Sequence, residues 1–125
     1  MTWFEERLSK TFVFGSFQDS HLLGIAGFYI QHGIKTQHKG VLWGMYVRPQ
    51  ARKMGLGQKL VEAVILHAQE YVELLQLMVL HDNEQALHLY ERCGFTAYGL
   101  EKDSLKYKER YYDELLMARQ IRPTP

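Results

Sequence analysis

The segment Arg52-Lys53-Met54-Gly55-Leu56-Gly57 places two basic residues and two glycines directly before an amphipathic stretch. The amino terminus of a helix leaves backbone N–H groups unpaired and carries partial positive charge, so a loop at that position can bind an anion. Glycine lets the backbone approach a phosphate without interference from a Cβ atom, and the basic side chains add charge. The segment is neither a Walker A sequence nor a complete G-x-G-x-x-G motif. It predicts a diphosphate site, with a simple turn before a helix as the alternative.

A strand and a helix must position this segment. Alternating side chains predict a strand over 41–47 that ends at Arg48-Pro49, because proline cannot donate to a strand ladder. From Gly55 the apolar period changes to that of a helix, which we expect to reach about residue 71. Four side chains of the strand are expected to share one face: Val41, Trp43, Met45 and Val47.

A second strand and helix follow the first pair. The stretch 74–80 is almost entirely apolar, which is typical of a central strand covered on both faces and parallel to its predecessor. Asn83 is a good amino-terminal cap for a short helix over 84–92, and Gly94 is well placed to end it.

The remaining elements are predicted to be strands. They cover 11–17 and 22–31, joined by a turn at Asp19-Ser20, and then 95–100 and 111–117. Polar residues 33–40 are expected to form a loop, and the charged stretch 101–110 is expected to connect the last two strands. Phe4 to Leu8 is interpreted as the end of a helix or an irregular lead-in. The order predicts an α+β fold with a mixed sheet.

Length and composition restrict the class of protein. The chain has 125 residues, 46% hydrophobic and 23% charged, which fits one globular domain over residues 1–125. A net charge of +1 gives no field that would recruit nucleic acid or a membrane. The amino terminus does not resemble a signal peptide, so we expect a cytoplasmic protein. Cys93 is the single cysteine and the six histidines show no metal-ligand spacing, so no metal is expected.

Two motifs together resemble the GNAT superfamily of N-acetyltransferases. The first is Arg52-x-x-Gly55-x-Gly57 after a strand, and the second is the later N-x-x-A-x-x-x-Y-x-x-x-G-F pattern, with Asn83, Ala86, Tyr90, Gly94 and Phe95. The resemblance covers about residues 11–117. It implies a mostly antiparallel sheet whose central parallel strands, 41–47 and 74–80, splay apart, with flanking helices. The amino-terminal strand and two helices of relatives would be missing or shortened here.

The resemblance also implies roles for individual residues. Acetyl-coenzyme A would be the acetyl donor, with its pyrophosphate held by backbone amides of about 53–58 and its pantetheine arm paired with backbone of the third strand. Tyr90 would be the general acid toward the coenzyme-A sulfur, although a tyrosine that only packs its helix is the alternative. The implied cofactor-binding residues are Met45, Tyr46, Val47, Arg52, Lys53, Met54, Gly55, Leu56, Gly57, Gln58 and Asn83.

The general base is not evident. Many relatives have a glutamate on the strand before the loop, whereas residues 41–47 contain no carboxylate. The options are a water relay to backbone carbonyls, which we favour, a residue such as His81 or Asp82, or no efficient catalysis. An acyl intermediate on Cys93 is not expected, because the family uses direct transfer.

Residues that would bind the acceptor are predicted from their type. Aromatic side chains and a histidine would line its pocket, although strand aromatics are more often core. Asp113 and Glu114 would attract a cationic amine, unless they are ordinary solvent-facing charges. The predicted substrate-binding residues are Tyr29, Trp43, His81 and Tyr112.

The leading hypothesis is an N-acetyltransferase that acts on a small-molecule amine or a protein amino group. The alternatives are a non-catalytic acyl-coenzyme A binding or regulatory module and, less favoured, a protein that binds a different nucleotide diphosphate. A sheet edge exposed by the short amino-terminal region would favour a homodimer.

Overall fold

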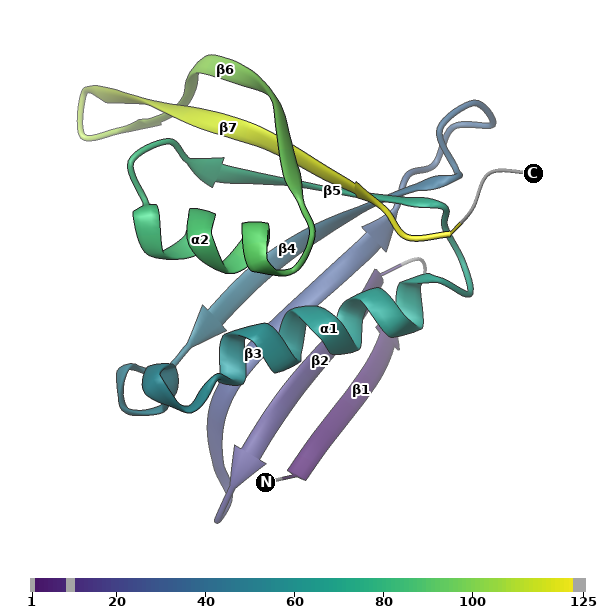
Figure 1. Ribbon diagram of the computed structural model, residues 1–125, viewed down its shortest axis with the longest axis vertical. Coiled ribbons are helices and arrows are strands. Elements are labelled where there is room, and N and C mark those ends of the chain that lie inside the picture. Colours follow the sequence, from purple (N-terminus) through teal and green to yellow (C-terminus); the bar gives the residue numbers. More distant parts are fainter. Residues whose placement is uncertain (1, 9–10, 123–125) are drawn as a thin grey trace.

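The described part of the chain forms one seven-stranded sheet with two α-helices and a short 3-10 helix (Figure 1). The computed structural model describes the backbone of residues 2–8 and 11–122, and the side chains of 11–52 and 55–122. The strands are β1 (Thr2–Leu8), β2 (Thr11–Gln18), β3 (His21–Ile30), β4 (Lys39–Val47), β5 (Leu74–Leu80), β6 (Thr96–Tyr107) and β7 (Arg110–Gln120). The helices are η1 (Pro49–Met54), α1 (Leu56–Ala68) and α2 (Glu84–Arg92).

The strand order is β1-β2-β3-β4-β5-β7-β6, and every neighbouring pair is antiparallel except β4 and β5. The predicted α+β class and mixed sheet are therefore confirmed. The β5 strand and helix α2 match the predicted residue ranges, because a short apolar run and an asparagine cap set their boundaries locally.

The central parallel pair separates after a short contact. Only Lys39, Gly40 and Val41 of β4 have partners on β5, which are Leu74, Leu75 and Gln76. Beyond these residues β4 continues against β3, and β5 continues against β7. Figure 1 shows the two halves of the sheet, β1–β4 and β5-β7-β6, diverging from this contact. The predicted splay is confirmed.

Both α-helices cover the same face of the sheet, which we call the helix face. Each connects strands through a crossover, and right-handed crossovers that advance in one direction along a sheet lie on one side of it. Figure 1 shows α1 lying across the half formed by β1–β4. Beneath it Phe12 and Phe28 stack with ring centroids 4.8 Å apart. The side chains of α1 that are buried against the sheet are Leu56, Leu60, Val61, Val64, Ile65 and Ala68.

The opposite side of the sheet, which we call the open face, is covered by neither helix. Trp43 lies over Gly27 there, since a Cβ atom on Gly27 would be 3.3 Å from Cε2 of the indole. On β5 the buried side chains Leu77 and Val79 alternate with Met78 and Leu80, so the latter two belong to the open face.

Two sequence expectations about the elements are wrong. Residues 4–8 are not helical or irregular: they belong to strand β1, which pairs antiparallel with β2. The charged stretch 101–110 is not a simple connection, because most of it extends β6 and β7 into a long hairpin. The stretch consists mainly of charged and polar side chains, which suit a solvated hairpin. The pairing of its strands is therefore not visible in the sequence as an apolar period. No helix among the described residues is long and apolar enough to span a membrane.

Candidate functional site

The amino terminus of α1 has the properties expected of an anion site. Gly55 stands between η1 and α1 with φ +71°, a left-handed conformation that glycine adopts without strain. None of the described side chains caps α1, and the first turn of the helix carries no acidic residue. The unpaired N–H groups and the positive end of the helix dipole are therefore not neutralised by a side chain of that turn.

The Arg52 side chain fixes the loop to the end of β4. Its Nε donates a hydrogen bond to the carbonyl oxygen of Val47 at 3.0 Å. This bond closes the turn between the strand and η1, so part of the guanidinium acts structurally rather than as a mobile charge. The side chains of Lys53 and Met54 lie outside the described residues.

Gly57 has a packing role beside its predicted contact with phosphate, and that contact stays a prediction. A Cβ atom at this position would lie 3.2 Å from Cδ2 of Leu89 and 3.4 Å from Cε of Met45. The missing side chain therefore lets α1 approach α2 and β4 closely. Gly55, by contrast, has open space around its position, so only its φ angle requires glycine.

A bulge in β4 shapes the opening between the two halves. Trp43 pairs with Gly27 and Tyr46 pairs with Ile25, so two β4 residues, Gly44 and Met45, oppose one β3 residue. Gly44 has φ +66°. Such a bulge bends its strand and leaves backbone groups outside the ladder, and β5 is already out of pairing distance here. A backbone edge is thus presented to the opening.

The bulge also overturns the expectation that four β4 side chains share one face. Trp43 lies on the open face, whereas Met45 approaches Gly57 of α1 and Val47 pairs with Gly24 on the helix face. One extra residue shifts the alternation by one position, so every later side chain changes sides.

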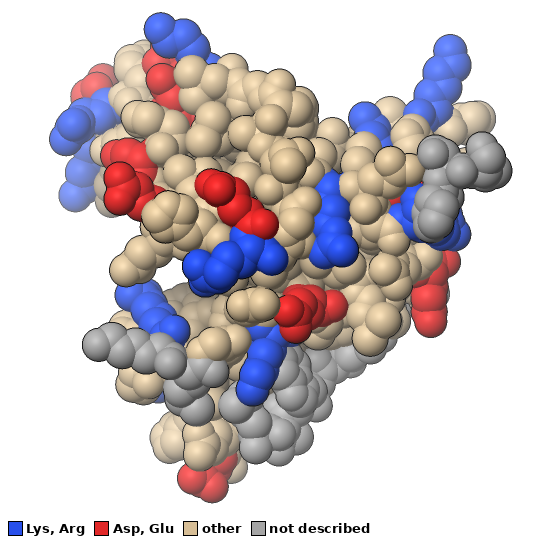
Figure 2. Space-filling model, in the orientation of Figure 1, with Lys and Arg blue, Asp and Glu red and all other residues tan. Residues whose placement is uncertain are grey.

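The divergence of β4 and β5 creates a cleft of ≈ 340 Å³ that is lined from both faces of the sheet. Figure 2 shows a notch where the two halves part, with Lys or Arg side chains on both sides of it. The lining residues are Leu42, Trp43, Gly44 and Met45 of β4, Leu77, Met78, Val79 and Leu80 of β5, Asn83 with Ala86, Leu89 and Tyr90 of α2, and Glu114 of β7.

Tyr90 lies on the helix side of this cleft and is only 7% exposed. Its ring packs edge-on against Phe95 with centroids 6.1 Å apart, and its carbonyl oxygen accepts a hydrogen bond from the Phe95 amide at 3.0 Å. Burial, with a smaller contribution from Cys93, raises the pKa of the phenol to about 12. The hydroxyl therefore stays protonated, and able to donate, throughout the neutral range.

Asn83 caps α2 and lines the cleft with the same side chain. Its Oδ1 accepts a hydrogen bond from the Ala86 amide at 3.2 Å. The cap uses the oxygen, so the amide nitrogen keeps its donors for a ligand in the cleft.

Cys93 is poorly suited to nucleophilic catalysis. It is 5% exposed, and burial is the first cause that raises the pKa of its thiol. Because the thiolate is the reactive form, a raised pKa and low exposure both reduce reactivity.

The predicted acceptor residues are divided between locations. Trp43 lines the cleft and is 42% exposed. Tyr29, His81 and Tyr112 are not among the described side chains that line it, and the Nδ1 of His81 lies 3.4 Å from the Asp113 carbonyl oxygen. Their roles in acceptor binding stay predictions.

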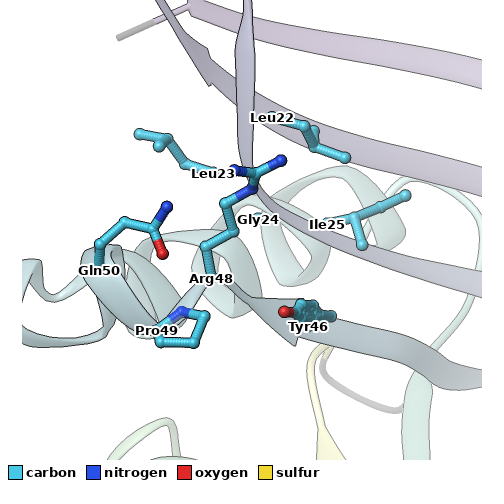
Figure 3. Close-up of a pocket in the computed structure, with 8 residues that line it drawn as sticks. All are labelled: Leu22, Leu23, Gly24, Ile25, Tyr46, Arg48, Pro49 and Gln50. Atoms are coloured by element: carbon cyan, nitrogen blue, oxygen red, sulfur yellow. The ribbon is translucent and has the colours of Figure 1, made fainter.

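Tyr46 turns its side chain toward a second cavity of ≈ 360 Å³ at the start of β3 and the end of β4 (Figure 3). Leu22, Ile25 and Arg48 also line this cavity. The residues that line this cavity and those that line the cleft have no member in common. The predicted contact of Tyr46 with the cofactor is made by its backbone. The position of the side chain does not test that contact, which stays a prediction.

The sequence interpretation missed the role of Gly44. A glycine inside a strand pattern is a recognised sign of a bulge or of close backbone approach, and it was the available signal. For Glu114 the sequence predicts only a charge that would attract an amine, because nothing in its local sequence indicates a place in the cleft.

Comparison with known proteins identifies the family. A sequence profile described as the acetyltransferase (GNAT) family matches residues 1–95. A mycothiol acetyltransferase of Propionibacterium freudenreichii is 39% identical over 59 residues, which is 46% of this chain and 19% of the relative. A 5-NmdU N-acetyltransferase of Pseudomonas phage PaMx11 is 35% identical over 75 residues, covering 60% of this chain and 52% of the relative.

The matched regions thus represent about half or less of these curated relatives. Among solved structures, an acetyltransferase-like protein of Salmonella typhimurium that contains acetyl-coenzyme A superposes with a TM-score of 0.83 at 20% identity, covering 92% of this chain and 67% of that one. At that identity the superposition supports the fold alone. The profile match covers most of the chain, and this chain therefore belongs to the acetyltransferase (GNAT) family.

Proposed function

We propose that the chain binds acetyl-coenzyme A and transfers its acetyl group directly to an amine nitrogen. The observation that carries the proposal is that the bulged edge of β4 and the buried phenol of Tyr90 line one cleft, and that Gly57, in the first turn of α1, lies against Met45 and Leu89 of the same lining. Membership of the acetyltransferase (GNAT) family gives this convergence a chemical meaning.

The donor half follows from backbone chemistry. Amides at the start of α1, near Gly55 to Gln58, would hold the pyrophosphate of the cofactor. The pantetheine arm would pair with β4 backbone at Met45 to Val47, where β5 no longer does so. Asn83 would donate its free amide to the same arm, and the thioester would then lie between β4 and β5 beside Tyr90.

The transfer step requires three things of the cleft. The amine lone pair attacks the thioester carbonyl carbon, and an N–H of the β4 bulge would stabilise the oxyanion that forms. The carbon–sulfur bond then breaks as the amide forms, and Tyr90 donates its proton to the departing sulfur. The same desolvation that raises the pKa of Tyr90 would raise that of the thiolate, which favours this donation.

Direct transfer is favoured over an acyl-enzyme route. Cys93 is the single cysteine of the chain, and its thiol is buried and disfavoured as a thiolate. Attack by the amine on the bound thioester requires no second nucleophile.

A pair of variants at Gly55 tests the donor site. Asn and Asp both tolerate the left-handed conformation, and nothing lies within 4 Å of a Cβ atom there, so Gly55→Asn and Gly55→Asp should fold alike. Only the aspartate adds negative charge at the phosphate position. We expect Gly55→Asp to bind acetyl-coenzyme A at least about tenfold more weakly than Gly55→Asn in calorimetry.

Equal affinities of the two variants would remove the loop from the binding site, and absence of binding by the unmodified protein would contradict the proposal as a whole. Thiol release should then be measured against alkyl amines, amino sugars and peptides with free α-amino or lysine groups. Binding without turnover of any amine would indicate an acyl-coenzyme A binding module. The cytoplasmic location, the homodimer and the absence of a metal stay predictions.

A further inference from the structure

Glu114 is the one carboxylate among the described residues that line the cleft. It pairs with Leu80 of β5, and directly opposed residues of neighbouring strands share a face, so Glu114 lies on the open face. Tyr90 reaches the cleft from α2 on the helix face. The two titratable groups of the lining therefore lie on opposite sides of the sheet and line the same cleft.

A wide irregularity in β6 orients this carboxylate. Glu101 pairs with Glu114 and Leu105 pairs with Tyr112, so residues 102–104 of β6 oppose Asp113 alone. The hydroxyl of Ser104, within this irregularity, donates a hydrogen bond to Oε1 of Glu114 at 2.5 Å.

The irregularity is fixed at its centre by a second bond. The Asp103 amide donates to Oδ1 of Asp113 at 2.8 Å, and Asp103 has φ +53°. Within the described residues Oε2 of Glu114 receives no hydrogen bond from the protein, so one oxygen is held while the other stays available to a ligand.

The groups around Glu114 do not neutralise it. Glu101 faces it from β6, and His81 follows Leu80 on the β5 side, where its ring and amide approach the Asp113 carbonyl oxygen. Tyr90 contributes a neutral phenol from α2. Asp113 precedes Glu114 on β7. No ion pair to Glu114 occurs among the described side chains. An unpaired carboxylate in a partly apolar cleft suits a cationic amine.

We propose that Glu114 is the general base that deprotonates the acceptor ammonium, an inference that rests on the proposed acetyl transfer. An alkyl ammonium loses two protons when it becomes an amide. Glu114 takes the first, which frees the lone pair for attack, and later releases it to solvent. The second proton leaves the nitrogen as the tetrahedral species collapses. It reprotonates Tyr90, which has given its own proton to the sulfur. Acetyl-coenzyme A and the alkyl ammonium thus yield amide, free thiol and one proton.

The pH dependence of Glu114→Gln distinguishes a base from a cation anchor. With the base present, kcat/KM for a simple alkyl amine should vary little between about pH 7 and pH 9, because the enzyme accepts the abundant ammonium form. The glutamine variant needs free amine, so its kcat/KM should fall about 100-fold at pH 7 and recover about tenfold for each pH unit. Turnover of hydroxylamine, which is largely unprotonated at pH 7, should change little.

Glu101→Gln is the matched control, since it removes the same charge from the same face beside the cleft. The kcat/KM of Glu101→Gln should stay within about twofold of that of the unmodified protein, because an exposed charge has a small effect. The variant Glu114→Gln keeps an oxygen that accepts from Ser104, and calorimetry with acetyl-coenzyme A should give unchanged affinity if its fold and donor site are intact.

Each result decides the assignment. Two results for Glu114→Gln would overturn Glu114 as the base while leaving acetyl transfer intact. One is a higher KM with an unchanged dependence of kcat/KM on pH, and the other is an equal loss of kcat/KM with the alkyl amine and with hydroxylamine. Normal activity of Glu114→Gln at all pH values would do the same. Failure of the unmodified protein to bind acetyl-coenzyme A, or to acetylate any amine, would instead contradict the proposed function on which the assignment depends.

Discussion

The two ends of the cleft are constructed differently. The proposed donor end uses backbone groups of β4 and of the start of α1, positioned by Gly44, Gly55 and Gly57. The proposed acceptor end uses side chains, with Trp43 from β4 and Glu114 from the β6–β7 hairpin. Backbone recognition depends on conformation and therefore on glycine, whereas side-chain recognition depends on strand register. Substitutions at the first end should disturb geometry, and those at the second should change chemistry.

The strongest test of the donor end is Gly44→Val. A β-branched residue at φ +66° is strained by about 1–3 kcal/mol, and removal of the bulge would relieve that strain. We expect loss of the exposed β4 edge, and a fall in kcat/KM of about 100-fold or more if the oxyanion donor is displaced. Gly44→Asn is the control, because asparagine tolerates this conformation and no atom lies within 4 Å of its Cβ. Similar activity of both variants would show that the bulge is dispensable.

Tyr90 can be tested through stability at high pH. The phenol ionises at a pKa of about 12 when folded and near 10 when unfolded, so the folded state binds more protons between these values. The stabilisation that the buried neutral phenol provides is therefore complete below pH 10 and is lost as the pH rises through 12. Relative to Tyr90→Phe, the protein should lose about 2–3 kcal/mol of unfolding free energy across this range in urea titrations. Parallel pH curves for the two proteins would mean that the phenol is not buried in solution.

The catalytic contribution of the same hydroxyl is separable. Tyr90→Phe keeps the ring packed against Phe95, so acetyl-coenzyme A should bind with unchanged affinity. Loss of the proton donor should lower kcat by roughly 10- to 100-fold, toward the lower end of general acid effects. Tyr107→Phe, on the exposed part of the hairpin, is the control for loss of a phenol elsewhere. Full turnover by Tyr90→Phe would leave this tyrosine with a packing role only.

The smallest effect is expected at Gly57. Alanine would press against Leu89 and Met45, whose flexible ends can move by a few tenths of an ångström, while helix propensity improves by about 1 kcal/mol. Stability of Gly57→Ala should therefore change little, and affinity for acetyl-coenzyme A should fall only about two- to fivefold through displacement of Met45. A loss of affinity as large as that of Gly55→Asp would show that phosphate approaches Gly57 directly.

Elements with strong local signals were predicted well from the sequence. Strand β5 and helix α2 follow from an apolar run, an Asn83 cap and Gly94, and the splay followed from the resemblance that two motifs together supported. Strand β1 was missed because residues 4–8 show no clear alternation, and its pairing with β2 is what makes it a strand. The hairpin was misread because solvated strands lack an apolar period.

The sequence by itself determined the order of the strands and α-helices from β2 onward and the family that the donor site resembles, since glycines, caps and apolar periods act over a few residues. Only the tertiary structure decided which side chains meet. The bulge at Gly44 reversed the faces of Met45 and Val47, and the irregularity in β6 placed Ser104 against Glu114. Strand register joins residues that are distant in the chain, so a shift of one position changes the contents of a site without altering the local pattern.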